Sequence, residues 1–462
     1  MVFPIAGGTQ DTGYEISNSL RFNDDDTAYL NRTRSSQSNT TGTFSVWTKM
    51  GNVGADNILF GGHTDVNNRS YIYFSDPDGY AGIFSRTSGS ADINFATNAR
   101  YRDPSAWYHV VVAIDTTQGT EANRFKMYVN GEQLSSFSAS SYPSQNASLP
   151  ILNQAAQTVG GGYGSSAVSA MAEGYMADAY YVDGTQYAAS DFGETNDNGV
   201  WIPKKFTGSF GTNGFKLEFQ QTGTGTASAS TIGADTSGND NHLTSNNLAA
   251  TDVTVDTPTN NFCTGNPIAK YINDTNVTFS EGNVKGVAGA VATSYNFLGT
   301  FGSANMNFYF EAKATNVDQN NDTRIGVVPV DSTAGIAING EHNQVVYRGD
   351  GSVVSTGETA LTSQGNITDG MIVGVAVDPD NNVKWYLNGT LTSTQSINAT
   401  YRGPVYMPYF RHVNSGTVEF NFGNPSFSIS SGNSDANGYG NFEYSVPSGY
   451  YALCTKNLAE YG

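Results

Sequence analysis

Charged residues are scarce in this sequence, and its few basic residues do not cluster. Asp, Glu, Lys and Arg make up 14% of the 462 residues, with 22 Lys and Arg against 41 Asp and Glu, and the formal net charge is −19. A nucleic-acid-binding protein needs a basic surface to neutralise phosphates. We therefore expect no nucleic-acid partner and no attraction to anionic membrane surfaces.

Cysteine and long apolar runs are also rare. Only Cys263 and Cys454 are present, which excludes a disulfide scaffold or a multi-cysteine zinc framework. No apolar run reaches the length of a membrane-spanning helix. The first residues, MVFPIAGGTQDTGYEI, lack the basic region and apolar core of a signal peptide. We expect no membrane insertion, assembly in a reducing cytoplasm, and free thiols.

Glycine, tyrosine and phenylalanine are abundant, with 52, 27 and 25 residues respectively. This composition is typical of many short strands joined by turns. The length suits two or three domains. The predicted fold class is therefore all-β, with two β-sandwich domains.

The stretch 107–134 predicts a hairpin near the centre of the first domain. Its two halves place an apolar residue at every second position: Val110, Val112, Ile114, Phe125, Met127 and Val129. This alternation predicts two strands with one face buried. Asn130-Gly131, a dipeptide suited to a left-handed turn, ends the second strand. The stretch 370–389 repeats this pattern in the second domain.

The strand-like stretches of residues 14–222 resemble the laminin G-like, concanavalin A-like jelly roll. The resemblance rests on the order of SLRFNDDDTAYL, TFSVWTKM, NILFGG, WYHVVVAID, FKMYVNG and EGYMADAYYVDG. An N-terminal arm, residues 1–13, precedes them. Residues 223–270 predict an irregular polar connector, although it could fold back on the first domain.

Residues 271–425 resemble the SPRY domain, another β-sandwich, through FYFEAKA, RIGVVPV, the 370–389 hairpin and GTVEFNFG. Residues 426–462 form a C-terminal tail that contains VPSGYYALCTKNL. The chain resembles phage structural proteins from virion and tail-fibre regions. The resemblance rests on the combination of the jelly roll, the Asp-Thr-Ser-Gly-Asn connector, the SPRY domain and this ending. The resemblance implies a virion protein that displays lectin-like modules for host attachment, with surface carbohydrate as the recognised group.

Two other functions stay open. The chain could decorate or cement the capsid without binding the host, or it could be a polysaccharide depolymerase. Neither a coiled-coil heptad run nor a repetitive shaft is present, so a compact appendage is expected rather than a complete long fibre. Other virion proteins and further copies of the chain are the expected partners.

Enzymatic activity is not expected. Jelly-roll glucanases need two carboxylates on one strand face, in a Glu-x-Asp-x-x-Glu pattern, and no Glu here has Asp two residues later. The nearest acidic pair is Glu173 and Asp178. His109 lies within a strand and is expected to be packed or hydrogen-bonded, whereas His63 and His242 lie in polar stretches.

Calcium is the one cofactor that the sequence suggests. Asp24, Asp25 and Asp26 place three carboxylates in one turn, and Asp235 opens a second acidic loop. Calcium prefers oxygen ligands from such flexible loops, and laminin G-like relatives often hold it. The alternative is that Asp favours turns for backbone reasons.

Aromatic side chains supply the candidate glycan-binding residues, because a sugar can stack on an exposed ring. Tyr71, Tyr73 and Tyr80, together with Trp107, surround loops of the first domain. In the second domain Trp385 and Tyr386 alternate, so one of the two should face outward. The alternative for each residue is a place in the core or in a domain contact.

Overall fold

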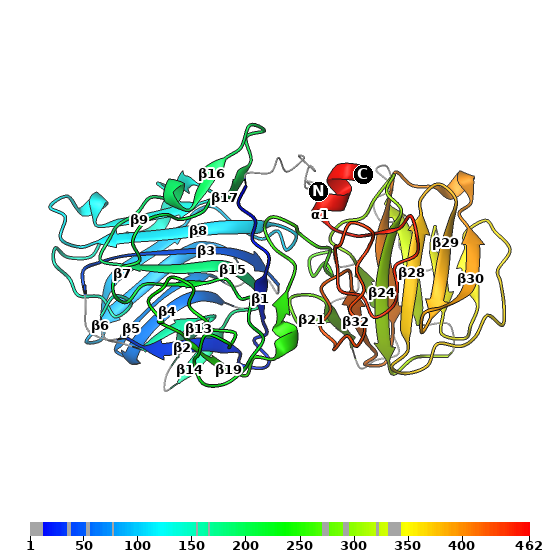
Figure 1. The fold of residues 1–462 in the computed structure, drawn as a ribbon, viewed down its shortest axis with the longest axis horizontal. Helices are drawn as coiled ribbons and strands as arrows, with labels where there is room; N and C mark the ends of the chain where they lie inside the picture. Colours follow the sequence, from blue (N-terminus) through cyan, green and yellow to red (C-terminus); the bar gives the residue numbers. More distant parts are fainter. Residues whose placement is uncertain are drawn as a thin grey trace. The chain divides into compact units, whose positions relative to one another are not determined.

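The computed structural model describes residues 13–34, 38–51, 56–75, 78–153, 156–164, 167–269, 277–289, 295–319, 323–330 and 343–462. Strands account for 46% of the structure and helices for 5%, so the predicted all-β fold class with two sandwiches is confirmed. The chain divides into two compact units, Gln10–Thr259 and Asn260–Gly462 (Figure 1). No helix among the described residues is long and apolar enough to cross a membrane.

The first unit contains two large antiparallel sheets. The β3 sheet has the order β10 (Glu132–Gln133), β9 (Phe125–Val129), β8 (Trp107–Asp115), β3 (Thr41–Met50), β15 (Gly174–Asp183), β1 (Ser19–Phe22) and β20 (Val253–Thr254), and β18 (Phe215–Leu217) pairs with β15. The β5 sheet has the order β11 (Phe137–Ser141), β7 (Ser90–Thr97), β6 (Ala81–Thr87), β5 (Asn68–Phe74), β4 (Asn57–Asp65), β12 (Ala156–Val159), β2 (Tyr29–Thr33) and β19 (Thr244–Asn246).

The core of the first unit lies between these two sheets. The inward residues include five of the six apolar positions predicted in stretch 107–134. These are Val110, Val112 and Ile114 on β8, and Phe125 and Met127 on β9. Ile72, Phe74 and Ile83 of the β5 sheet belong to the same cluster.

The other face of the β3 sheet is also buried, which corrects the expectation of one buried face. Val111 and Ala113 of β8 contact Phe192 and Phe206, which belong to a segment that contains η2 (Ala189–Asp191), β16 (Gly193–Thr195) and β17 (Trp201–Pro203). This packing explains why Val111 and Ala113, which face away from the core between the two sheets, are also apolar.

Residues 223–259, predicted to lie in a connector, are packed as part of the first unit. β19 extends the β5 sheet beside β2, and β20 extends the β3 sheet beside β1. Two apolar residues of this polar segment, Ile232 and Leu243, are fully buried in the core. The short helix η3 (Ala250–Asp252) precedes β20.

The second unit is another pair of sheets. The β24 sheet has the order β21 (Val277–Ser280), β22 (Lys285–Ala288), β32 (Thr417–Asn421), β24 (Phe308–Thr315), β28 (Ile372–Asp378), β29 (Asn382–Leu387) and β30 (Thr390–Ser396). The β25 sheet has the order β23 (Tyr295–Leu298), β31 (Val405–His412), β25 (Arg324–Val330), β26 (Val345–Arg348) and β27 (Val353–Ser355). Phe310, Val375, Ile325 and Phe410 share its core.

The C-terminal residues after 425 fold onto the second unit. β33 (Tyr451–Ala452) pairs in parallel with β24, and α1 (Thr455–Tyr461) follows it. The buried carboxylate of Glu311 on β24 accepts hydrogen bonds from the backbone N–H groups of Glu443 and Tyr444, at 3.0 and 2.8 Å. The segment expected to be a tail is therefore an ordered part of this unit.

The two predicted Asn-Gly turns are confirmed. Asn130 and Gly131 have φ values of 49° and 81°, and Asn388 and Gly389 have values of 46° and 79°. Both dipeptides thus adopt the left-handed conformation that a tight hairpin requires. The remaining small elements of the first unit are η1 (Glu121–Asn123) and the hairpin of β13 (Gly161–Tyr163) and β14 (Val168–Met171), and η4 (Ala399–Tyr401) lies in the second.

Candidate functional site

The three candidate tyrosines of the first unit lie together on the outer face of the β5 sheet. Tyr71 and Tyr73 alternate along β5 with the core residue Ile72, so both rings face away from the core. The ring centroids of Tyr71 and Tyr73 are 5.4 Å apart, and those of Tyr73 and Tyr80 are 6.0 Å apart. The structure therefore joins residues that the sequence placed in separate stretches.

Phe84, which sequence reasoning missed, completes this aromatic group. It is directly opposite Tyr71 in the pairing of β5 with β6, and their ring centroids are 5.4 Å apart. Tyr73 is opposite Gly82, and a Cβ atom there would lie 2.9 Å from the Tyr73 ring. Glycine thus lets the Tyr73 ring lie close against β6. We call Tyr71, Tyr73, Tyr80 and Phe84 the aromatic face.

Arg69 and a small hairpin border the aromatic face. The Arg69 guanidinium carbon lies 6.0 Å from the centroid of the Tyr71 ring. Its Nη1 donates hydrogen bonds to the carbonyl oxygens of Tyr163 and Gly164, at 2.7 and 2.6 Å. These two residues belong to the β13–β14 hairpin and the turn after β13. The hairpin is therefore fixed beside β4, where the Tyr163 ring also stacks on His63 at 4.4 Å.

The raised pKa values of Tyr71 and Tyr73 keep their phenols in the neutral form. Burial and the nearby carboxylate of Asp56 raise the pKa of Tyr71, while the guanidinium groups of Arg69 and Arg86 oppose the shift. Burial, and then the neighbouring Tyr80, raise the pKa of Tyr73. Neutral phenols can both donate and accept hydrogen bonds. The face therefore offers apolar ring surface together with hydroxyl groups, next to cationic side chains.

The other candidate aromatics lie elsewhere. Trp385 has no exposed surface, and its Nε1 donates a hydrogen bond to the carbonyl oxygen of Ile325 at 3.1 Å. Trp385 is therefore a core residue, which corrects its choice as a glycan contact, whereas its neighbour Tyr386 is half-buried. Trp107 is half-buried on the β3 sheet, where its Nε1 donates to Oδ1 of Asp256 at 3.3 Å.

The candidate calcium ligands differ in how their carboxylates are used. Asp235 accepts four hydrogen bonds, from the N–H groups of Lys216, Ser237 and Asn241 and from the Ser237 hydroxyl, at 2.8 to 2.9 Å. These donors occupy both oxygens, so a cation at Asp235 would have to displace them.

Asp24, Asp25 and Asp26 lie in the turn between β1 and β2. Asp25 and Asp26 are exposed, and Asp24 is half-buried. Burial, and then the charge of Asp25, raise the pKa of Asp24. Among the described residues no group of three His, Cys, Asp or Glu side chains is arranged to hold a metal ion. Calcium at this turn stays a prediction.

The acidic pair and the strand histidine are both engaged within the fold. Glu173 and Asp178 are buried, and Asp178 accepts hydrogen bonds from the hydroxyls of Tyr14 and Tyr180. His109 lies 2.8 Å from the Ser45 hydroxyl through Nε2, while its Nδ1 accepts from Trp201 Nε1 at 3.0 Å. This Ser–His contact lacks the carboxylate that would orient a catalytic imidazole.

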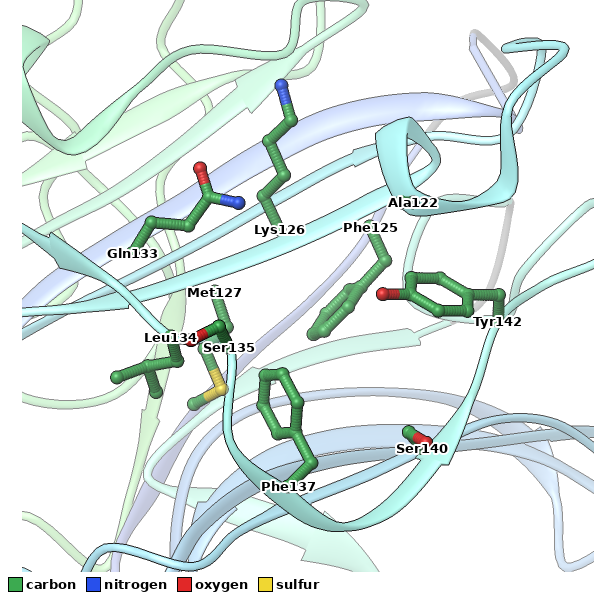
Figure 2. A pocket seen from close by; sticks show the side chains of 10 residues that line it. All are labelled: Ala122, Phe125, Lys126, Met127, Gln133, Leu134, Ser135, Phe137, Ser140 and Tyr142. Carbon is green, nitrogen blue, oxygen red and sulfur yellow. The ribbon is translucent and has the colours of Figure 1, made fainter.

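A pocket of about 290 Å³ opens at the side of the first sandwich, between β9 and β11. Its lining consists of Ala122, Phe125, Lys126, Met127, Gln133, Leu134, Ser135, Phe137, Ser140 and Tyr142. Figure 2 shows the apolar side chains converging, while Lys126 extends away from them. The rings of Phe125, Phe137 and Tyr142 all contact the core residue Phe95. This pocket is a second candidate site of the unit.

The solved structures that resemble the chain include the heptameric SAP-like pentraxin of Limulus polyphemus, with 15% identity, a TM-score of 0.29, and coverage of 38% of this chain and 80% of the pentraxin. CBM40 of the Ruminococcus gnavus IT-sialidase shows 17% identity, coverage of 30% and 72%, and a TM-score of 0.24.

The SPRY domain of human HERC1 shows 17% identity, coverage of 29% of this chain and 86% of that domain, and a TM-score of 0.24. No curated protein sequence matches the chain. Residues 22–178 match the family model of the concanavalin A-like lectin/glucanases superfamily, and residues 307–425 match that of the SPRY domain. The chain therefore contains a concanavalin A-like domain followed by a SPRY domain.

Proposed function

We propose that this chain is a phage virion protein whose concanavalin A-like domain binds carbohydrate on the host surface during adsorption. The observation that carries the glycan part is the aromatic face, where Tyr71 and Phe84 pair across two strands next to Tyr73. The match to a superfamily of lectins and glucanases supports the same class of ligand.

The aromatic face suits a sugar for physical reasons. A pyranose ring has apolar C–H faces and a polar rim, and aromatic rings offer flat apolar area at a low loss of side-chain entropy. Tyr71, Tyr80 and Phe84 are half-buried, so part of each ring remains accessible. Guanidinium and phenol groups beside the rings supply hydrogen bonds to the hydroxyl groups of a sugar.

A single site on a sheet face buries little ligand surface, so its own affinity is expected to be modest. Repeated copies on one particle would convert weak sites into avid attachment. This reasoning supports a homo-oligomer displayed on a tail fibre, spike or head appendage. The ordered set of jelly roll, Asp235-Thr-Ser-Gly-Asn segment, SPRY domain and VPSGYYALCTKNL ending supports the virion assignment.

Two alternative functions, capsid decoration and depolymerase activity, predict different results from glycan binding. A capsid decoration protein would bind other virion chains and leave host cells unbound. A depolymerase would release reducing ends from host polysaccharide. The half-exposed aromatic face favours glycan binding over decoration, and the buried state of Glu173 and Asp178 favours binding over hydrolysis by that pair.

The test is binding of the labelled full-length protein to bacterial host cells, with and without free host polysaccharide. We expect saturable binding that the polysaccharide competes away, and at least tenfold weaker binding by Tyr71→Ala. Tyr142→Ala is the matched control, because it removes a half-buried tyrosine of the same domain in the side pocket.

Loss of binding in Tyr142→Ala with full binding in Tyr71→Ala would place the site in the pocket and contradict the proposal. Absence of binding by the folded wild-type protein would favour the decoration role, and release of reducing ends would favour the depolymerase.

A further inference from the structure

Two arginines lie directly opposite each other on the outer face of β5 and β6. Arg69 on β5 is the register partner of Arg86 on β6, and the next outward pair along these strands is Tyr71 and Phe84. Like charges at directly opposite positions destabilise an antiparallel pair. This arrangement is therefore unfavourable in the isolated domain. The two cations lie side by side in a chain whose net charge is −19.

Within the part of the chain that the structure describes, neither arginine of this opposed pair forms an ion pair, although the carboxylate of Asp56 acts on the neighbouring Tyr71. Asp92 lies on β7, next to Ala91, which is the register partner of Arg86. Among the described residues Asp92 likewise forms no ion pair with either arginine.

Each guanidinium uses only part of its hydrogen-bonding capacity within the chain. Arg69 donates through Nη1 to the hairpin carbonyls, and Arg86 donates through Nη2 to the carbonyl oxygen of Gly89 at 2.8 Å. The Nε atoms of both arginines are buried and have no acceptor. Buried donors without acceptors are unfavourable. Among the described residues, Nη2 of Arg69 and Nη1 of Arg86 donate no hydrogen bond, so each side chain retains a terminal donor for an additional acceptor.

The arginine pair and the aromatic face form one continuous surface. The Arg69 guanidinium lies 6.0 Å from the Tyr71 ring centroid, and both arginines act electrostatically on the Tyr71 phenol. A ligand ring packed on Tyr71 and Phe84 would hold its substituents next to the guanidinium groups. Planar guanidinium groups pair with carboxylates through two parallel hydrogen bonds.

We propose that Arg69 and Arg86 bind the carboxylate of an acidic sugar, a uronic or sialic acid residue, whose ring packs on Tyr71 and Phe84. The inference rests on the proposed function and narrows its ligand to acidic polysaccharide. It also explains why two opposed cations are present on a sheet of an acidic protein.

The experiment measures binding of the full-length protein to hyaluronan, polygalacturonate and polysialic acid, to the carboxyl-reduced form of each polymer, and to neutral dextran and galactan. We expect the protein to bind at least one acidic polymer, and to bind its carboxyl-reduced form at least tenfold more weakly. Raising the salt concentration should weaken binding to the acidic polymer, because exposed charge pairs are screened.

The principal variant is Arg86→Gln. Among the described residues Arg86 donates a hydrogen bond only to Gly89 of the adjoining turn, whereas Arg69 holds the β13–β14 hairpin. We expect at least tenfold weaker binding to the acidic polymer. Arg402→Gln is the matched control, because Arg402 is an exposed arginine of the SPRY domain, 3.7 Å from Asp380. Arg86→Lys keeps the charge but not the planar guanidinium, and it serves if Arg86→Gln folds poorly. Its affinity for the acidic polymer should lie between that of the wild type and that expected for Arg86→Gln.

Unchanged acidic-polymer binding by Arg86→Gln and Arg86→Lys would overturn the inference. Equal binding of acidic and carboxyl-reduced polymers, lost in Tyr71→Ala, would overturn it and leave the proposed function intact. Binding to no polysaccharide, whether in this panel or from the host, would overturn both.

Discussion

The ammonium nitrogen of Lys49 lies 2.8 Å from Oδ2 of Asp256, and both side chains are buried. Lys49 is on β3, and Asp256 follows β20 at the end of the polar segment that was expected to be a connector. Trp107 Nε1 donates to the other carboxylate oxygen of Asp256. This ion pair fixes the end of the segment against the β3 sheet.

Removal of one partner of this pair should destabilise the first unit strongly. Asp256→Asn leaves the Lys49 ammonium buried without its counter-charge, for which we expect a loss of about 3–5 kcal/mol in the free energy of unfolding. Urea unfolding of the full chain, followed by tryptophan fluorescence, measures the change. Asp240→Asn removes an exposed carboxylate as a control, and a loss below about 1 kcal/mol for Asp256→Asn would refute a structural role for the pair.

Gly131 should not tolerate a side chain. Its φ of 81° is left-handed, and a Cβ atom there would lie 2.4 Å from the Trp201 ring. Gly131→Ala should therefore lower the unfolding free energy by about 2–4 kcal/mol, from backbone strain and overpacking. Gly119→Ala, at a turn glycine with no atoms within 4 Å of the new Cβ, should change stability by less than about 0.5 kcal/mol. Equal effects would contradict this account of the turn.

His109 should make the first unit less stable in mild acid. Burial lowers the pKa of its imidazole to about 3, whereas histidine in an unfolded chain has a pKa of about 6.5. The contribution of neutral His109 to the free energy of unfolding is fully present above pH 6.5. It is lost as the pH falls toward 3, because in this range only the unfolded chain binds the proton.

The expected slope from this histidine is about 1.4 kcal/mol per pH unit between about pH 6 and pH 4. Unfolding free energies of wild-type protein and His109→Gln across that range measure it, and the variant should lack this contribution. Identical pH dependence in the two proteins would show that His109 is protonated in the fold or is exposed.

Calcium should stabilise the first unit if it binds the turn of Asp24, Asp25 and Asp26. A cation would relieve the repulsion by which Asp25 raises the pKa of Asp24. At a calcium concentration 100 times the dissociation constant, the gain would be about 2.7 kcal/mol. Thermal unfolding with calcium, with magnesium and with EDTA measures it, and Asp25→Asn should reduce the gain. An unfolding temperature that is the same in calcium and EDTA would exclude this site.

The sequence was sufficient to predict the elements that depend on local pattern. Alternating apolar residues predicted β8 and β9, and Asn130-Gly131 predicted the left-handed turn between β9 and β10. Trp385 and Tyr386 were predicted to face opposite sides, and the structure shows which one is buried. Local periodicity contains this information because strand side chains alternate.

Features that depend on pairing between strands could not be predicted in this way. Phe84 and Arg86 join the site only through the register of β6 against β5, which a single sequence does not fix. The packing of residues 223–259 depends on a few buried apolar residues, such as Ile232 and Leu243, within a polar stretch. Composition alone predicted a connector there, with folding back on the first domain left as the alternative.

The most direct test of the central claim is a crystal structure of the full-length protein with an oligosaccharide of the polymer that it binds. The account predicts a sugar ring packed on Tyr71 and Phe84, with its carboxylate at Arg69 and Arg86. A sugar bound in the pocket of Phe125 and Tyr142, or on the SPRY domain, would contradict it.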